Sequence, residues 1–514
     1  MVGADLPATR VDGIELGASL NGRIIPIRGI SASDERAWRD LANRAVEPNP
    51  FYEADCVIPA ATHQAFGAEI NLAVAEHEGR FFGCVPIRSV RRWKFPYPVV
   101  TSQVRRMGYL GTPLVDPEDG PRAAEALLEV IATTRTPLDS RIFLLDTSAA
   151  DGPVAGYFRT AAARLGFALR AYETWERGKL ERLETPTYDR VHSSKTRYNL
   201  RRQHRLLAED LGTEVALVDR TADPSALAEY VELEAQGYKA TEGVAMTTVA
   251  GEPEYFVDMC RRFAEAGRLH VLALQAGDKP VAMEIWVRGG EGLFMIKISY
   301  DERYKRFGPG VLLQTEAMRY FHEHTDASWI DTCTSEGNEL LLRLYPARRK
   351  MEMLSVVLGS SLIDRAVVRG FVAIRPLHKH LYELRHREVK APDKGADQKS
   401  ESQKSESEQA TQTNRALDHA SKSGAVGASK NAARPKGSDS PKGSDSPKGR
   451  DSSKGQGASQ IQGGGEISGT TMTPHETELS LAAAASRETL IYPVSEAATA
   501  NLKPVLGSRA VNGG

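Results

Sequence analysis

The chain changes in composition near residue 390, and this change limits how much of its 514 residues can form a core. From residue 391 to the end there is no Phe and no Trp, and the only Tyr is Tyr492. The hexapeptide PKGSDS starts at Pro435 and again at Pro441, and PKGRDS follows at Pro447. Such a segment cannot bury enough apolar surface to offset the entropy that it loses on ordering. We therefore expect residues 391–514 to be a disordered low-complexity tail, either a neutral solvated segment or a tether for partners.

Charge, cysteine content and hydropathy exclude several classes of protein. The 66 Lys+Arg and 67 Asp+Glu give a formal net charge of -1, which excludes a globally basic nucleic-acid binder but not a local basic patch. No metal-binding motif and no run of 18 uncharged apolar residues occurs, and the first ten residues do not resemble a signal peptide. We therefore expect a cytoplasmic protein without a metal site or a membrane-spanning helix. Its cysteines form no CxxC pair and are expected to be reduced, partly buried thiols: Cys56, Cys84, Cys260 and Cys333.

Ahead of the tail, the pattern of strands and helices runs through two similar cycles. The first has a hairpin within residues 70–90, helices at 120–134 and 154–165, and a strand at 141–146. The second has a hairpin within residues 268–288, a strand at 293–300, a helix at 311–324 and a strand at 329–332. This alternation predicts an α/β (α+β) fold with two domains, each a mixed twisted sheet flanked by helices. The predicted division is a flexible N-terminus at 1–20, domains at 21–185 and 186–360, and a helical segment at 361–390.

The clearest chemical signal lies where the strand at 293–300 joins the helix at 311–324. The connecting loop ends in Gly308-Pro309-Gly310. Glycine lets a backbone turn tightly and approach a ligand closely, and a helix N-terminus offers free N–H groups and a partial positive charge. Together these features suit the diphosphate of a cofactor. The same residues also fit an ordinary strand–turn–helix junction, because Gly-Pro-Gly is a common breaker.

The spacing basic-x-x-Gly-x-Gly in this loop resembles the coenzyme A diphosphate loop of the GNAT N-acyltransferase superfamily. Lys305 stands where that family usually has Arg or Gln, and Gly308 and Gly310 fill its two glycine positions. The resemblance implies acetyl-CoA or another acyl-CoA as co-substrate, with strand N–H groups polarising the thioester carbonyl. It implies these cofactor-binding residues: Ile298, Ser299, Tyr300, Lys305, Arg306, Phe307, Gly308, Gly310 and Val311.

A narrower resemblance covers most of residues 48–357. The segments NPFYEADCV, SSKTRYNLRR, Gly237-Tyr238-Lys239 and KISYDERYKRFGPGVLL together resemble bacterial acetyltransferases linked to cellulose and exopolysaccharide synthesis (the CelD/BcsL type). That group is related to the Fem transferases, which carry two GNAT-like domains in tandem. The resemblance implies a degenerate first domain and an acyl-CoA site in the second. One departure is Tyr238, with Ala240 and Thr241 after Lys239, where relatives commonly have Trp-Lys-Gly.

Strand alternation predicts which side chains of the strand at 293–300 point the same way. Lys297 is the one charged side chain in this otherwise apolar strand, and we expect it either to hold an anionic acceptor or the cofactor, or to reach solvent from a strand edge. By the period of two, one face should carry Lys297, Ser299 and Asp301, and the other should carry Ile296, Ile298 and Tyr300.

Acyl transfer needs a base for the acceptor and an acid for the leaving thiolate. The predicted catalytic residues are Glu284, Lys297, Asp301, Tyr304 and Tyr345. Glu284 is the best-placed inward carboxylate if its strand turns that face to the core, and an outward position fits the pattern equally. Asp301 is a base candidate or a loop charge. Both tyrosines are candidate acids or packing residues.

Two clusters of basic residues stand out in the body. The predicted helix at 193–209 has no acid between His192 and Arg205, and the resemblance places it near the second domain's site. We expect it to bind an anionic acceptor or to be a solvated basic face, and the predicted acceptor-binding residues are Lys195, Arg197, Arg201 and Lys239. The other cluster mixes cations with aromatic residues, a combination that can bind nucleic acid or glycan but that we expect to be a long hairpin loop here: Arg88, Arg91, Arg92, Lys94, Arg105 and Arg106.

These observations predict an acyl-CoA-dependent N- or O-acyltransferase, with acetyl transfer favoured. The expected acceptor is an amino sugar or hydroxyl on an exopolysaccharide precursor, either a small molecule or a lipid- or nucleotide-linked sugar. One alternative is a Fem-type transferase that takes an amino acid from aminoacyl-tRNA, which the basic clusters would suit. Another is a catalytically silent scaffold of the polysaccharide-synthesis machinery.

Overall fold

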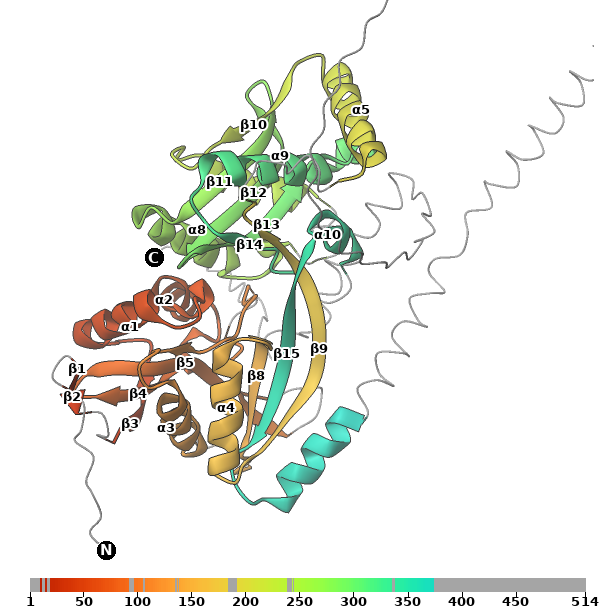
Figure 1. Ribbon diagram of the computed structural model, residues 1–514. Coiled ribbons are helices and arrows are strands. Elements are labelled where there is room, and N and C mark those ends of the chain that lie inside the picture. The colour runs from red at the N-terminus through yellow and green to blue at the C-terminus, as the bar shows by residue number, and fades with distance from the viewer. Residues whose placement is uncertain are drawn as a thin grey trace, which may run out of the picture. The chain divides into compact units, whose positions relative to one another are not determined.

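The computed structural model describes most of the first 373 residues, and all of the described residues belong to one structural unit (Figure 1). Most of the predicted flexible N-terminus, the predicted disordered tail and residues 374–390 of the predicted helical segment lie outside the described residues. Residues 362–373 are helical, as predicted for that part of the segment. The described ranges are 10–11, 14–15, 19–91, 97–104, 107–134, 136, 138–183, 192–237, 243, 245–334 and 338–373.

The first half of the chain alternates strands with helices. Two two-residue strands, β1 and β2 (Arg10–Val11 and Ile14–Glu15), precede this arrangement. Its strands are β3 (Asn21–Pro26), β4 (Asn71–His77), β5 (Arg80–Arg91), β6 (Pro98–Thr101), β7 (Leu114–Val115), β8 (Ile142–Ala149) and β9 (Ala168–Glu181). Its helices are α1 (Ala32–Arg44), α2 (Ala54–His63), α3 (Gly120–Ala132) and α4 (Pro153–Arg164).

The second half repeats this alternation. Its strands are β10 (Val215–Asp219), β11 (Leu269–Ala276), β12 (Lys279–Gly289), β13 (Gly292–Tyr300), β14 (Trp329–Asp331) and β15 (Ala347–Val357). Its helices are α5 (Ser194–Leu211), α6 (Ala226–Gln236), α8 (Glu252–Glu265), α9 (Pro309–His324) and α10 (Glu339–Leu344), with a 3-10 turn, η5 (Glu302–Phe307), before α9.

Local chemistry explains where several of these elements begin and end. Glu78 and Gly79 both have positive φ (50° and 80°), so the Glu-Gly pair forms the tight turn between β4 and β5 of the predicted hairpin. The side chain of Ser193 accepts a hydrogen bond from the Thr196 backbone N–H at the start of α5, and Gly212 ends that helix with a φ of 65°. Pro309 occupies the first turn of α9, where its missing N–H costs nothing.

The strands of both halves form one mixed sheet of 13 strands within the described residues. The order along the sheet is β10-β11-β12-β13-β14-β9-β15-β8-β6-β5-β4-β3, and β7 pairs with β5. The last strand, β15, therefore lies between β8 and β9 of the first half, and β9 pairs with β14 of the second (Figure 1). This confirms the predicted mixed α/β fold and adds an exchange of strands that alternation could not reveal. The division of the chain at residue 185 remains a prediction.

A β-bulge in β13 corrects one expectation. The register between β12 and β13 shifts after Ile285, which pairs with Lys297, because Trp286 pairs with Met295 and Ile296 is the extra residue. Ile296 therefore packs in the core with Ile285, whereas Tyr300 packs in the core beneath α9. The prediction that Ile296 shares a face with Ile298 and Tyr300 was wrong, because simple alternation does not survive the bulge.

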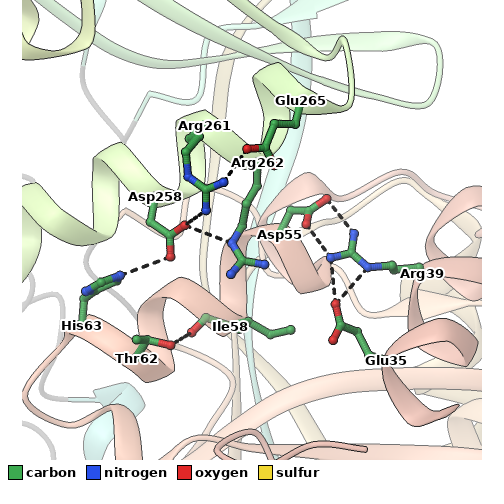
Figure 2. Close-up of polar contacts among 10 residues, drawn as sticks. All are labelled: Glu35, Arg39, Asp55, Ile58, Thr62, His63, Asp258, Arg261, Arg262 and Glu265. Carbon is green, nitrogen blue, oxygen red and sulfur yellow. Dashed lines mark hydrogen bonds and ion pairs between the residues drawn. The ribbon is translucent and has the colours of Figure 1, made fainter. Parts of the chain in front are cut away.

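Polar contacts join helices that are far apart in the sequence (Figure 2). His63 at the end of α2 lies 3.1 Å from the carboxylate of Asp258 on α8, and Asp258 also accepts hydrogen bonds from Arg261 and Arg262. Between the same two helices, the Cys56 thiol of α2 lies 3.3 Å from the Tyr255 hydroxyl of α8, and both side chains are buried. All four cysteines are thiols, as predicted, and they are buried rather than partly buried.

Candidate functional site

The parallel strands β13 and β14 stay together for three residues and then separate. Their register pairs Gly292 with Trp329 and ends at Phe294 opposite Asp331, although β13 continues to Tyr300. Beyond Asp331 the chain follows β9 instead, because the Thr332 N–H donates to the Gly178 carbonyl at 3.2 Å. Such a divergence leaves one strand extending past its neighbour at the carboxyl end of the pair.

The loop that leaves β13 at this point ends at the N-terminus of a helix. Gly308 has a φ of 64° and a ψ of 52°, a left-handed conformation that glycine adopts without strain. The amides of Gly310 and Val311 lie in the first turn of α9, where a helix has no internal acceptors for its N–H groups. A Cβ added to Gly310 would lie 3.4 Å from the Tyr300 ring, so this helix end sits against the end of β13. The predicted strand–loop–helix junction is confirmed, with the helix starting at Pro309 rather than at residue 311.

The cations of this loop are exposed. The side chain of Lys305 is 57% exposed and lies 3.6 Å from the Glu302 carboxylate. Arg306 is 63% exposed and pairs with Asp210 in the last turn of α5. Surface pairs of this kind hold their partners weakly. Both cations can therefore turn to an anion placed at the start of α9.

Two predicted catalytic residues meet through a third side chain on the α9 face of the sheet. Gln314 of α9 donates from its amide nitrogen to Glu284 at 2.8 Å, and the Tyr345 hydroxyl donates to the Gln314 carbonyl at 2.5 Å. All three side chains are buried, so the inward position of Glu284 is the correct one of the two alternatives. Burial raises the pKa of Glu284 to about 8, and it raises the pKa of Tyr345 well above its usual value. The second carboxylate oxygen of Glu284 has no hydrogen-bond partner among the described residues.

Lys297 lies in the other core, the one that also holds Ile285. Its ammonium is 2.8 Å from Glu234 of α6, and the two side chains are 14% and 0% exposed. Glu234 also accepts the backbone N–H of Met246 at 2.9 Å. Lys297 is therefore held inside by a carboxylate and does not reach out to solvent. Glu234 was not singled out in the sequence, although an acid four residues after the buried Tyr230 on one helix face was a usable signal.

The remaining catalytic candidates belong to the loop. Asp301 accepts hydrogen bonds from the Arg303 backbone and guanidinium at 3.0 Å and caps η5. Partial burial opposes its ionisation, but the hydrogen bonds from Arg303 outweigh it and lower the pKa of Asp301. The Arg303 guanidinium lies 5.6 Å from the centre of the Tyr304 ring. Asp301 and Tyr304 thus share Arg303 as a partner. The side chain of Ser299, a predicted cofactor-binding residue, is buried.

The basic helix α5 touches the loop at one end only. The Arg306–Asp210 pair lies in its last turn, whereas Lys195 and Arg197 lie in its first turn. Thirteen residues separate Arg197 from Asp210, or about 20 Å along a helix axis. Arg201, between them, is exposed, and Lys239 lies outside the described residues.

The other basic cluster belongs to a hairpin, as expected. Strands β5 and β6 pair Arg88 with Thr101 and Arg91 with Pro98. Arg88 stacks on Phe66 at 4.1 Å from the ring centre. The other cations of the cluster, Arg92, Lys94, Arg105 and Arg106, lie outside the described residues.

The part of the chain that the structure describes shows neither a metal-binding cluster nor a membrane-spanning helix. No group of three or more His, Cys, Asp or Glu side chains there could hold a metal ion. Among its described helices, none is long and apolar enough to cross a membrane.

Several solved structures match this chain, with low TM-scores and low sequence identities. FemX matches with a TM-score of 0.44 and 10% identity over 62% of this chain and 95% of that chain. The C-terminal domain of a putative lysylphosphatidylglycerol synthetase from Agrobacterium fabrum gives 0.39 and 12% over 66% and 96%. A tandem GNAT protein from the clavulanic acid pathway gives 0.36 and 14% over 66% and 100%. At such TM-scores these similarities carry no argument about this chain.

One segment of the chain matches a protein-family model. The sequence has no significant match among curated proteins. Residues 194–339 match the family model described as an acetyltransferase (GNAT) domain. This segment includes α5, the diverging strands β13 and β14, the Lys305–Gly310 loop and α9. The part of the chain that carries the candidate site is therefore similar to acetyltransferase (GNAT) domains.

Proposed function

We propose that the chain is an acyl-CoA-dependent N- or O-acyltransferase, most directly an acetyltransferase, with its site in residues 186–360. The observation that carries this proposal is the divergence of β13 from β14 directly ahead of a glycine-bounded helix N-terminus. The family match of residues 194–339 supports it. Under this proposal residues 21–185 and 186–360 are tandem GNAT-like domains in a cytoplasmic enzyme.

In this proposal the loop before α9 binds the diphosphate of acyl-CoA, and strand β13 binds its thioester. The diphosphate binds the first-turn amides of Gly310 and Val311, with Lys305 and Arg306 supplying positive charge. The thioester lies along the part of β13 that extends past β14, where backbone groups of residues 298–300 polarise its carbonyl. Phe307 is buried and packs in the core that also contains Tyr300 and Leu312.

The hydrogen-bonded set of Glu284, Gln314 and Tyr345 is the proposed source of the proton for the leaving thiolate. Tyr345 follows α10, the next element after β14, and its hydroxyl is fixed by Gln314. We assign it the role of the acid that protonates the leaving thiolate. Glu284 is protonated at neutral pH because its pKa is about 8, so its role is to support this network rather than to act as a base. Asp301 remains the base candidate of the loop.

The first half does not offer an equivalent place for acyl-CoA. Its parallel pair, β6 and β8, corresponds to β13 and β14 in strand order. Here the chain itself continues along β8, because Ser102 N–H donates to the Leu144 carbonyl at 3.0 Å and Gly111 N–H donates to the Thr147 carbonyl at 2.8 Å. A Cβ on Gly111 would lie only 1.7 Å from the Asp146 carbonyl oxygen. The chain's own backbone thus occupies the place beside β8, and this supports one acyl-CoA site per chain.

The acceptor we propose is an amino sugar or hydroxyl on an exopolysaccharide precursor, free or linked to a lipid or a nucleotide. Lys195, Arg197, Arg201 and Lys239 are its proposed contacts. A Fem-type transfer from aminoacyl-tRNA is the second candidate, favoured by the exposed cations of α5. It would require salt-sensitive, selective binding of aminoacyl-tRNA. A silent scaffold in polysaccharide synthesis would bind no acyl-CoA.

Calorimetric titration of the full chain with acetyl-CoA tests the proposal. We expect binding at a 1:1 ratio, and we expect Gly308→Glu to abolish it through strain and repulsion of the diphosphate. Gly166→Glu is the matched control, because Gly166 has a φ of 68° and open space around it, remote from the loop in sequence. Absence of binding by the folded wild-type chain would contradict the proposed function. Equal binding by wild type and Gly308→Glu would contradict the placement of the diphosphate.

A further inference from the structure

The ion pair between Lys297 and Glu234 is unusual for its position in the sheet. Lys297 is on β13, which has β12 on one side and β14 on the other. Charged side chains rarely stay inside such a sheet unless a partner compensates for lost solvation. Glu234 supplies that compensation from α6 at 2.8 Å, and the Met246 N–H fixes the carboxylate in turn. The ammonium is therefore held at a defined point.

This arrangement uses only part of the hydrogen-bonding capacity of Lys297. An ammonium group has three N–H donors. Within the described residues one of them reaches Glu234, and the other two have no acceptor. The side chain is 14% exposed, so these two N–H groups are available to an oxygen of a bound substrate.

The position of Lys297 indicates which oxygen this is. Lys297 is three residues beyond Phe294, the last residue of β13 that pairs with β14. It thus belongs to the stretch where the strands have separated and where the proposed function puts the thioester. Lys297 pairs with Ile285, which packs in the core on the face of the sheet opposite α9, so the Lys297 side chain lies on that face too. A donor at that point faces a carbonyl group held along β13 from the side away from the cofactor loop.

We propose that Glu234 is a positioning residue that holds Lys297 so that its remaining N–H groups bind the oxyanion formed during acyl transfer. The inference rests on the proposed function. The acceptor's nitrogen or oxygen forms a bond to the carbonyl carbon, and the carbonyl electron pair moves to oxygen, where Lys297 binds it. That pair then re-forms the carbonyl as the C–S bond breaks. The thiolate of coenzyme A leaves and takes up one proton, and the acceptor loses one to a base or to water. Charge placed in advance where the oxyanion develops lowers the barrier without reorganisation.

The test uses hydroxylamine as a generic acceptor, so that it does not depend on the natural one. We expect Glu234→Gln to lower kcat for acetyl transfer from acetyl-CoA to hydroxylamine about 100-fold, with the KM for acetyl-CoA changed less than twofold. Lys297→Met should lower kcat equally. The double variant should be no worse than either single variant, because each removes the same interaction. Glu53→Gln is the matched control, since it breaks another partly buried ion pair, with Arg268 at 2.6 Å.

The outcomes separate this inference from the proposed function. If wild type binds no acetyl-CoA and transfers no acetyl group, the proposed function fails, and the oxyanion role fails with it. If wild type is active and Glu234→Gln keeps its kcat, only the positioning role of Glu234 is contradicted. A loss in Glu53→Gln as large as that in Glu234→Gln would also contradict it, because both losses would then follow from weakened packing. Additive losses in the double variant would contradict the shared role of the pair.

Discussion

The Arg177 guanidinium of β9 and the Asp331 carboxylate of β14 lie 2.6 Å apart, with exposed fractions of 1% and 0%. Asp331 binds a second guanidinium, that of Arg349 on β15, also at 2.6 Å. One buried carboxylate thus joins the three strands through which the two halves of the chain share a sheet. The same residue ends the pairing of β14 with β13, so the joint between the halves and the opening of the candidate site meet at Asp331.

Replacement of the Asp331 carboxylate should lower the stability of the fold. Asp331→Asn leaves two guanidinium groups without their charged partner, and we expect the free energy of unfolding to fall by about 3–5 kcal/mol. Denaturant unfolding of the full chain measures this. Glu181→Gln is the control, because the Glu181 side chain is 64% exposed and its pair with Lys179 should contribute under about 1 kcal/mol. Equal effects of the two substitutions would contradict the structural importance of the buried joint.

Glu284 should give stability a distinct dependence on pH. Its pKa is raised to about 8 by burial, above its value in an unfolded chain of about 4.3, so the folded state binds the extra proton between these values. This contribution is fully present below pH 4, falls by roughly 1.4 kcal/mol per pH unit as pH rises, and is lost above pH 8. Glu284→Gln keeps the acceptor for Gln314 but does not ionise. The stability difference between variant and wild type should therefore grow in the variant's favour from pH 5 to pH 8. A difference that does not change with pH would contradict the buried neutral carboxyl.

Gly111 should tolerate no side chain. The Cβ of Gly111→Ala would lie 1.7 Å from the Asp146 carbonyl oxygen, so the segment that fills the first half's strand pair must move. We expect the free energy of unfolding to fall by about 2–3 kcal/mol or more. Gly156→Ala lies within α4 with open space around it, and it should instead stabilise by about 0.5–1 kcal/mol. Thermal and denaturant unfolding compare the two, and a mild Gly111→Ala would mean that this segment is loosely packed.

Lys305 should contribute to acyl-CoA binding by charge alone. Lys305→Ala removes an exposed cation next to the start of α9, and we expect acetyl-CoA to bind about tenfold more weakly, or about 1.4 kcal/mol. The loss should shrink as salt is added, because the interaction is screened. Lys279→Ala, at the exposed start of β12, should leave the affinity unchanged. A salt-independent loss would indicate that Lys305 acts by shaping the loop.

The parts of the fold and site that sequence could predict are those set by local chemistry. Gly308, Pro309 and Gly310 define a turn and a helix start within a few residues, and the structure has both. The inward position of Glu284 was left open because an apolar strand does not reveal which face its one acid takes. Tyr345 was a candidate by type, but its link to Glu284 runs through Gln314, a residue with no signal of its own.

The parts that sequence missed depend on contacts between distant segments. The pairing of β15 with β8 and β9 joins residues about 170–215 positions apart, and nothing in either strand's own pattern specifies that partner. Glu234 lies on one helix and Lys297 on a strand 63 residues later, so their pairing appears only once α6 packs on the sheet. The extra residue at Ile296 altered the face of every residue before it in β13, which simple alternation could not anticipate.

Hydrogen exchange of the full chain with and without saturating acetyl-CoA tests the central claim most directly, because it reads both halves at once. The account predicts slower exchange of backbone amides in residues 295–311, at the end of β13 and the start of α9. It also predicts no change in residues 102–104 and 107–112, which already fill the corresponding place in the first half. Protection of residues 102–104 and 107–112, or unchanged exchange at 295–311 under conditions where acetyl-CoA is bound, would contradict it.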